Sequence, residues 1–400
     1  MTEYPYLIVG GGMTGDAAIQ GILDVDPAAS IALLGEETNP PYNRPPLTKG
    51  LWKGKPLEAV FRKPHEGAVR MALGRRAVSL DPGRHQVTDD QGTVYQYGRL
   101  LLATGGNPRR LAFAGGLITY FRTLDDYHSL RAQAGAGKRV AVIGGGFIGS
   151  ELAAALRSTG SDVVMAFPEA GIGARLFPAA LATYLNDFYR EKGVEVVAGR
   201  VITSAASKGR RIEVRLREAE GAGEQVIEVD AIVAGLGIEP RVDLARSAGL
   251  GVGQGILVDE LLRTSHPDVF AAGDVAEFIS HLLETRRRVE HEDNALTMGR
   301  LAGRNMAGKA EPYHHEPYFY SDLFELGYEA VGELDPRLET VSDWSEEFRK
   351  GAVYYVKGGR VRGVLLWNVW DQVPAARLLI AERGPLSAKE LIGRLPKSGG

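Results

Sequence analysis

The sequence contains no cysteine. Disulfide bonds, thiolate metal ligands and cysteine nucleophiles are therefore excluded together, although this absence alone does not fix the cellular compartment. The eight histidines show no spacing typical of a metal site, so we predict none. His314 and His315, which are adjacent in an expected loop, are interpreted as solvated side chains.

Long apolar runs and a strong net charge are also missing. No apolar run approaches the roughly 18 residues that a transmembrane helix needs, and the N-terminus lacks the pattern of a secretory signal. The formal net charge of -3 gives no bulk attraction to nucleic acid or anionic lipid. We expect a cytoplasmic monomer or homodimer with no nucleic-acid partner. Stable membrane insertion is not expected, because the amphipathic segment 386–395 is short and weakly apolar.

What the sequence does contain is two glycine-rich motifs, each preceded by a short apolar segment and followed by a helical pattern. A strand, such a loop and a helix N-terminus together bind the pyrophosphate of a dinucleotide. Each motif is followed by an acidic residue, Glu36 or Glu169, where a ribose hydroxyl is expected to bind. Two complete copies predict two bound dinucleotides, which suggests a flavin and a nicotinamide exchanging a hydride. The predicted contacts are Gly10, Gly11, Gly12, Met13, Thr14 and Gly15 in the first motif and Gly144, Gly145, Gly146, Phe147 and Ile148 in the second.

The acidic residue of the second copy bears on which nicotinamide is used. The carboxylate of Glu169 would repel a 2′-phosphate, so we expect a preference for NADH over NADPH. Arg175 lies close by in sequence and could soften this preference, or it could be an ordinary surface arginine.

A chain of 400 residues suggests two or three domains. Strand-like and helix-like patterns alternate up to about residue 110, with a helix from Thr14 to about Leu23, and a second βαβ unit begins at Arg139. From about residue 313 the segments become rich in aromatic residues and are expected to form antiparallel strands. The fold class predicted is α/β, with two Rossmann-like nucleotide-binding domains and a C-terminal α+β domain. The expected boundaries are 1–113 with 237–312, 114–236, and 313–400.

Several segments are specific enough to resemble a known family. The chain is similar to the FAD-dependent pyridine nucleotide-disulfide reductases, and within them to the branch of ferredoxin and rubredoxin reductases and apoptosis-inducing factor. The resemblance covers nearly the whole chain. It rests on 41–49 (PYNRPPLTK), 103–109 (ATGGNPR), 271–274 (AAGD), 286–291 (RRRVEH), 166–169 (AFPE), and 321–323 (SDL) with 327–330 (GYEA).

The resemblance implies that the first motif holds FAD and the second NAD. Arg44 would contact the FAD pyrophosphate and Asp274 the ribitol. Ala77 and Arg122 would lie along the adenine half and the domain junction, and Glu290 and His291 would border the flavin and nicotinamide. Further cofactor contacts are implied at Glu37, Thr104, Gly105, Gly237, Tyr320 and Glu329.

Three residues are expected to take part in catalysis. Lys49 follows a rigid Pro-Pro segment and Glu151 lies one turn into the helix after the second motif. In similar proteins these two pair beside flavin N5, and the alternative is an inter-domain salt bridge without a redox role. Phe147 would cover the flavin face or would be an ordinary helix-packing aromatic. Tyr320 stands where similar proteins commonly have Trp, which predicts a different flavin potential or acceptor access.

The expected function is that of an NADH-dependent flavoprotein reductase. Because no cysteine pair is present, the flavin must pass electrons to an external acceptor, and ferredoxin or rubredoxin is the leading candidate. An NADH oxidase, a quinone reductase and an NADH-sensing interaction protein remain open. The basic residues Arg286, Arg287 and Arg288, extended by Lys53, Lys55, Arg62 and Lys63, could dock an acidic carrier or could form a solvated face. The absence of a mitochondrial leader and the short C-terminal domain favour a bacterial or archaeal member.

Overall fold

The computed structural model describes residues 2–63, 67, 69–113 and 115–395. It divides into two compact units. The first unit comprises Met1–Arg44, Pro56–Asn107 and Glu239–Tyr318, and the second comprises Pro45–Lys55, Pro108–Ile238 and Phe319–Gly400. This division joins the second nucleotide-binding segment to the C-terminal segment, and the three predicted domain boundaries stay predictions.

The first unit is built on a seven-stranded sheet in the order β3-β2-β1-β6-β5-β4, with β18 pairing with β6. Four neighbouring pairs are parallel, and β5 and β4 extend the sheet in antiparallel fashion. Residues such as Leu7, Leu33 and Leu101 are fully buried, as expected for parallel strands covered on both faces. The strands are β1 (Thr2–Val9), β2 (Ile31–Gly35), β3 (Val69–Leu73), β4 (Ala77–Asp81), β5 (Gln86–Asp89), β6 (Val94–Leu102) and β18 (Val269–Ala271).

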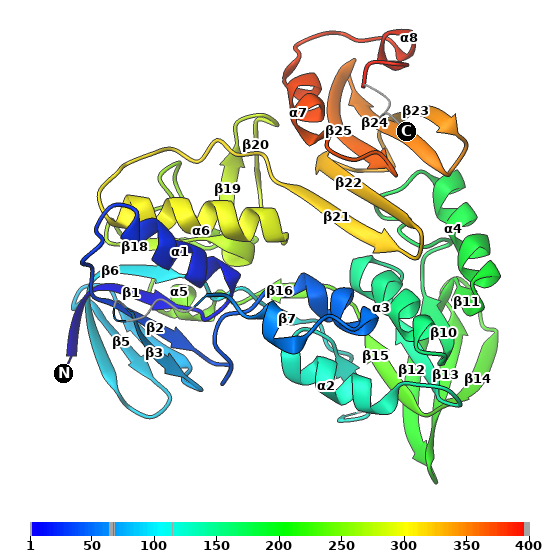
Figure 1. The fold of residues 1–400 in the computed structure, drawn as a ribbon, viewed down its shortest axis with the longest axis horizontal. Helices are drawn as coiled ribbons and strands as arrows, with labels where there is room; N and C mark the ends of the chain where they lie inside the picture. The colour runs from blue at the N-terminus through cyan, green and yellow to red at the C-terminus, as the bar shows by residue number, and fades with distance from the viewer. Residues whose placement is uncertain (1, 64–66, 68, 114, 396–400) are drawn as a thin grey trace. The chain divides into compact units, whose positions relative to one another are not determined.

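Two helices, α1 (Met13–Leu23) and α6 (Glu292–Met306), lie side by side over this sheet (Figure 1). Their close approach depends on glycine, since a Cβ atom at Gly303 would lie 2.1 Å from the carbonyl oxygen of Ala18. The bounds of α1 confirm the predicted helix from Thr14 to about Leu23. The other elements of this unit are η3 (Leu57–Val60), α5 (Asp243–Ser247), η4 (Gly273–Val275), and the small sheet of β17 (Ile256–Leu257), β19 (Ala276–Ser280) and β20 (Thr285–Arg287).

The second unit contains a five-stranded parallel sheet in the order β11-β10-β9-β15-β8. Helix α3 packs on β9 and β10, α4 packs beside β11, and an antiparallel meander of β12, β13 and β14 lies next to them (Figure 1). The elements are β8 (Ile118–Tyr120), α2 (Leu124–Gln133), β9 (Arg139–Ile143), α3 (Phe147–Ser158), β10 (Asp162–Phe167), α4 (Ala179–Glu191), β11 (Val194–Ala198), β12 (Arg200–Lys208), β13 (Arg211–Glu218), β14 (Glu224–Val229) and β15 (Ala231–Ala234).

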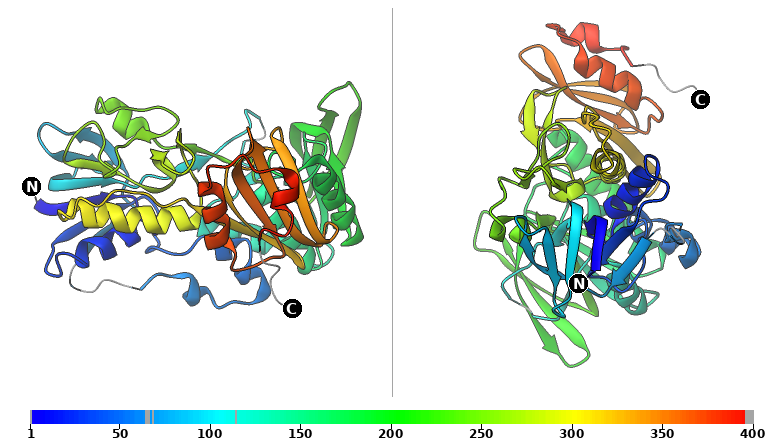
Figure 2. Two further views of the ribbon diagram at one scale, coloured as in Figure 1. Left: turned by 90° about the horizontal axis from the view of Figure 1, so that it is seen from above. Right: turned by 90° about the vertical axis from the view of Figure 1, so that its left-hand side faces the viewer.

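The C-terminal part of this unit is an antiparallel sheet in the order β21-β22-β25-β24-β23, and α7 covers one of its faces (Figures 1 and 2). Trp367 is fully buried, and the Tyr355 hydroxyl donates to the carbonyl of Leu176 at 2.6 Å, which ties this sheet to the nucleotide-binding part. The predicted aromatic strands are confirmed. The elements are β21 (Tyr318–Leu323), β22 (Leu326–Gly332), β23 (Glu339–Glu346), β24 (Lys350–Lys357), β25 (Arg360–Trp367), α7 (Val373–Ala381) and α8 (Ala388–Leu391).

The remaining elements are short. The proline-rich stretch, residues 40–53, contains two 3-10 turns, and β7 pairs with β16 in a two-stranded sheet. Their bounds are η1 (Pro45–Leu47), η2 (Gly50–Lys53), β7 (Gly106–Pro108) and β16 (Ile238–Pro240). Among the helices of the described residues, none is both long and apolar enough to cross a bilayer. The predicted α/β fold class is confirmed.

Candidate functional site

The first glycine motif has the geometry of a pyrophosphate site. Gly10 has φ 131°, and a Cβ atom there would lie 2.1 Å from the Ala103 carbonyl oxygen. A Cβ atom at Gly15 would meet the Gly10 carbonyl oxygen at 2.1 Å, so helix and strand pack closely. A Cβ atom at Gly12, in contrast, would have no other atom within 4 Å. No side chain caps α1, whose free N–H groups suit a phosphate group.

The second motif repeats this arrangement residue by residue. Gly144 has φ 117°, and a Cβ atom there would lie 2.4 Å from the Gly235 carbonyl oxygen. A Cβ atom at Gly149 would lie 1.9 Å from the Gly144 carbonyl oxygen. Gly146 again faces open space, and α3 begins without a side-chain cap. The two motifs therefore share one backbone geometry, and each has the form of a turn that receives a dinucleotide pyrophosphate.

The predicted flavin-site residues of the first unit gather at one edge of its sheet. Gly10, Glu36, Thr104 and Asp274 follow the carboxyl ends of β1, β2, β6 and β18, which run parallel. Ligands of such sheets bind at this edge. A Cβ atom at Gly273, beside Asp274, would lie 2.2 Å from Thr14 Oγ1, so the AAGD segment touches the first motif.

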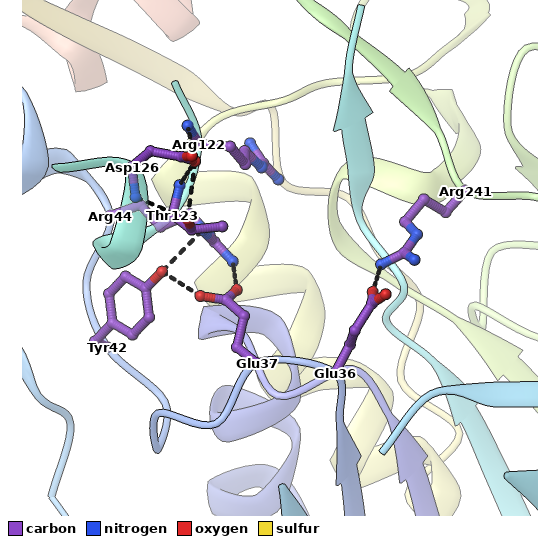
Figure 3. Close-up of polar contacts among 8 residues, drawn as sticks. All are labelled: Glu36, Glu37, Tyr42, Arg44, Arg122, Thr123, Asp126 and Arg241. Carbon is purple, nitrogen blue, oxygen red and sulfur yellow. Dashed lines mark hydrogen bonds and ion pairs between the residues drawn. The ribbon is translucent and has the colours of Figure 1, made fainter. Parts of the chain in front are cut away.

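Two carboxylates at the end of β2 are held by different arginines (Figure 3). Glu36 forms an ion pair with Arg241. Glu37 accepts from Arg44 at 2.6 Å and from the Tyr42 hydroxyl at 2.5 Å. The guanidinium predicted to contact the FAD pyrophosphate is thus fixed by a neighbouring carboxylate and an aromatic ring.

In the second unit, the backbone of Arg122 is fixed at the start of α2 (Figure 3). Asp126 accepts from the N–H groups of Arg122 and Thr123 at 3.0 and 2.8 Å, and the Thr123 side chain completes a capping box. This reciprocal cap stabilises the helix N-terminus.

The centre of the second unit is the buried carboxylate of Glu151, which is 5% exposed. Lys49 forms an ion pair with it, the Thr48 hydroxyl donates to Oε2 at 2.5 Å, and the Ser321 hydroxyl donates to Oε1 at 2.6 Å. The Lys49 ammonium also lies 5.1 Å from the ring centre of Tyr320. The predicted pairing of Lys49 with Glu151 is present, and Tyr320 is beside it.

Sequence reasoning gave no role to Thr48 or Ser321. Both lie in segments that carry the family resemblance, but nothing local indicates that their hydroxyls converge on one carboxylate.

The ring of Phe147 packs edge-on against Phe319, with 5.2 Å between the ring centroids, and tilted against Tyr328, with 6.3 Å between the centroids. Packing of this kind accounts for an aromatic residue at the start of α3 and leaves its proposed contact with the flavin a prediction.

The acidic residue after β10 is also paired. Glu169 accepts from Arg175 at 2.5 Å, and the arginine side chain is 79% exposed. The two residues that were expected to oppose each other in cofactor choice therefore bind each other in this structure.

The other predicted residues are located within the elements of their own units. Ala77 begins β4, Gly11 and Gly145 lie within the motif turns, Met13 begins α1, and Ile148 is the second residue of α3. The carbonyls of Gly105 and Gly237 accept from Arg241 and Arg109 N–H groups. Glu290 pairs with Arg288 at 2.5 Å, and His291 precedes α6. Burial raises the pKa of Glu329, which accepts from the Asp371 N–H group.

Three cations of the proposed basic docking surface are neutralised locally. Arg62 pairs with Asp16, Arg287 with Glu316, and Arg288 with Glu290. Lys53, Lys55 and Lys63 are exposed.

Comparison with known proteins identifies the family. The family model described as pyridine nucleotide-disulphide oxidoreductase matches residues 4–299. The chain belongs to this family. A second model, for the C-terminal region of mitochondrion-associated apoptosis-inducing factor, matches residues 302–347 and 342–382. FAD and NADH are the cofactors of this oxidoreductase, as the two motifs indicate.

Its relatives include both branches of the predicted resemblance. Apoptosis-inducing factor 1 of Dictyostelium discoideum is 33% identical over 95% of this chain and 79% of its own length. The ferredoxin reductase subunit of 5,5'-dehydrodivanillate O-demethylase from Sphingobium is 33% identical over 96% of this chain and 94% of its own. The structure of putidaredoxin reductase in covalent complex with putidaredoxin superposes with a TM-score of 0.88, at 29% identity, covering 97% of this chain and 95% of that one. The predicted family and cofactors are confirmed, and the individual site residues stay predictions.

We expect Ser321→Ala to lower the free energy of unfolding by about 1.5–3 kcal/mol, because it removes one donor from a buried carboxylate. In a Glu151→Gln background, Ser321→Ala should lower the free energy of unfolding by a smaller amount, since contacting residues couple by about 0.5–3 kcal/mol. Urea unfolding of the wild type, both single variants and the double variant measures this coupling. Strictly additive losses would contradict it.

The stability of the apoprotein should fall as the pH is lowered from about 7 to 4. The pKa of His291 is lowered from 6.5 to about 4, chiefly because burial desolvates the imidazolium; Asp274 and Asp293 oppose this shift and Arg287 adds to it. Between these two values the unfolded chain binds more protons than the folded chain, so acid favours unfolding.

His291→Gln should make the free energy of unfolding depend less steeply on pH in this window. Urea unfolding at several pH values measures the slope, with His128→Gln, which alters an exposed histidine of α2, as the control. An unchanged slope in His291→Gln would rule out this residue as the source.

Proposed function

We propose that this protein is an NADH-dependent flavoprotein reductase that passes electrons to a small iron–sulfur carrier of the ferredoxin or rubredoxin type. The observation that carries the proposal is the combination of two complete dinucleotide motifs with a chain that has no cysteine. Without a dithiol, reducing equivalents have no internal acceptor beyond the flavin. The named functions of the Sphingobium subunit and of putidaredoxin reductase support an external carrier.

When bound, NADH supplies a hydride and FAD converts it into single electrons for the acceptor. The chain's own contribution begins with positioning. Gly12 and Gly146 leave room for the two pyrophosphates, and Glu36 and Glu169 would hold the ribose hydroxyls. Arg44, oriented by Glu37 and Tyr42, would complement the negative charge of the FAD pyrophosphate.

Lys49 and Glu151 are proposed to act on the flavin ring. An ammonium group near N5 favours the reduced, negatively charged form of the ring system. The carboxylate keeps this ammonium in one position and moderates its charge. Thr48 and Ser321 in turn keep the carboxylate in place, so Lys49 is oriented by a carboxylate that two further hydrogen-bond donors hold.

The match to the apoptosis-inducing factor C-terminal region favours one alternative, an NADH-sensing interaction protein. Such a sensor would stay reduced for minutes in air, whereas a reductase reoxidises quickly with its carrier.

From the sequence alone, a cytoplasmic location is also proposed.

The test of the proposed function is a steady-state comparison of acceptors. Purified protein with FAD is mixed with NADH and with a [2Fe–2S] ferredoxin, rubredoxin, a soluble quinone or O₂. We expect the highest kcat/KM with ferredoxin or rubredoxin. Faster turnover with O₂ or quinone would replace this function with an oxidase or quinone reductase, and a long-lived reduced state with every acceptor would indicate the sensor.

Lys49→Ala should slow flavin reduction by NADH and lower the flavin potential, because a stabilising positive charge is lost. Glu151→Ala should also slow reduction, since the lysine is no longer oriented. The double variant should lose less than the sum of both effects, with a coupling of about 0.5–3 kcal/mol in activation free energy. Stopped-flow reduction at full flavin occupancy measures this. If the effects of the two single variants on the reduction rate simply add in the double variant, Glu151 has a structural role only.

Glu169→Ala should narrow the preference for NADH over NADPH. The substitution removes a repulsive carboxylate and releases the exposed Arg175, which could then pair with a 2′-phosphate. Arg175→Ala is the matched control and should keep the preference. Stopped-flow reduction with each donor gives the ratio of rates, and a wild type that uses NADPH as well as NADH would refute the assignment of Glu169.

A further inference from the structure

Three side chains with metal-binding atoms meet on the surface of the first unit, outside the nucleotide motifs. Glu260 lies in the turn after β17, His281 follows β19, and His314 lies between α6 and β21. One ligand atom from each lies within 4.8 Å of the other two. The two imidazole rings are 4.4 Å apart between centroids, at 61° to each other. All three side chains are exposed to solvent.

The backbone that carries these side chains is held in place by buried hydrogen bonds. The N–H group of Tyr313, next to His314, donates to the carbonyl oxygen of Glu260 at 2.8 Å. The buried amide of Asn305 donates to the carbonyls of Leu261 and Glu311 at 3.0 and 2.8 Å. The loops of Glu260 and His314 are therefore fixed relative to each other.

The third loop is tied to the same segment. The hydroxyl of Ser280, next to His281, donates to the buried carboxylate of Glu316 at 2.5 Å and accepts from the Leu283 N–H group at 3.0 Å. The residue beside each histidine is therefore anchored, and the three ligand atoms already lie within 4.8 Å of one another. Such preorganisation reduces the entropy lost on binding.

The neighbouring ionisable groups have other partners, and these three do not. His315 pairs with Asp293, and Glu316 pairs with Arg287 at 2.5 Å. Across the described residues, Glu260, His281 and His314 enter no hydrogen bond or ion pair through their side chains, and the two imidazole rings pack against each other. Two imidazoles and one carboxylate are thus left together and available to a ligand.

We propose that Glu260, His281 and His314 form a binding site for a divalent transition-metal ion, with Zn²⁺ as the best match. Imidazole nitrogen selects such ions, whereas Mg²⁺ and Ca²⁺ prefer oxygen ligands alone. Three protein ligands leave a further position for water, as in open zinc sites. A bound ion joins three loops of the first unit, one of which leads into β21. The site is independent of the proposed electron acceptor.

Isothermal titration of the EDTA-treated, FAD-loaded protein with ZnCl₂ tests this site. We expect one saturable equivalent in the wild type. His281→Ala and His314→Ala should each weaken binding at least about tenfold, since even residues outside the coordination shell cost 10–100-fold. Glu260→Gln, which keeps the shape of the side chain, should weaken binding as well. Zn²⁺ should also raise the melting temperature of the wild type more than that of either histidine variant.

His128→Ala is the matched control, because it removes an exposed histidine from α2. This variant should bind one equivalent of Zn²⁺ as tightly as the wild type does. The flavin absorbance spectrum of each variant checks that the fold and the cofactor are retained. The proposal is overturned if the wild type shows no saturable equivalent, or if the two histidine variants, folded and flavin-loaded, bind Zn²⁺ as the wild type does.

Discussion

The arrangement of the second unit depends on the neutralisation of one buried carboxylate. An ionised group removed from water is costly unless its oxygens accept hydrogen bonds. Glu151 obtains three donors from two segments far away in sequence: Thr48 and Lys49 in the proline-rich stretch, and Ser321 on β21. Helix α3, the proline-rich stretch and the C-terminal sheet must therefore meet at this point. The side chain that is proposed to tune the flavin is the same one that fixes the packing around it.

A different constraint governs both nucleotide motifs. The contacts around Gly10, Gly15, Gly144 and Gly149 are with backbone carbonyls, which cannot rotate away as a side chain could. The strand, turn and helix can therefore adopt this geometry only without Cβ atoms. Gly12 and Gly146 differ, because a Cβ atom at either would meet no other atom within 4 Å, which leaves space for a ligand. One motif thus combines packing glycines with glycines that keep a surface open.

The sequence was informative wherever the relevant contacts are local. The strand, glycine turn and helix of each motif lie within one short segment, and the fold class and the expectation of two dinucleotides followed from them, while the family resemblance assigned FAD to the first and NAD to the second. Lys49 and Glu151 were paired through resemblance, and the structure brings them together. The roles of Thr48 and Ser321 could not be predicted, because they arise when distant segments fold together. The same is true of Glu260, His281 and His314, whose spacing in sequence has none of the regularity of a metal motif.

The arginines that pair with Glu36 and Glu169 have a consequence for how the cofactors exchange. On the proposed assignment, a departing ribose leaves each carboxylate without its hydroxyl partners. Arg175, which is 79% exposed, can then reoccupy Glu169 as the nucleotide leaves. On this assignment, the ion pair would reduce the cost of release and speed the dissociation of NAD⁺. On the same assignment, Arg241 would play this part for Glu36 at the FAD site. A pair that weakens affinity in this way speeds turnover where the ligand must leave in every cycle.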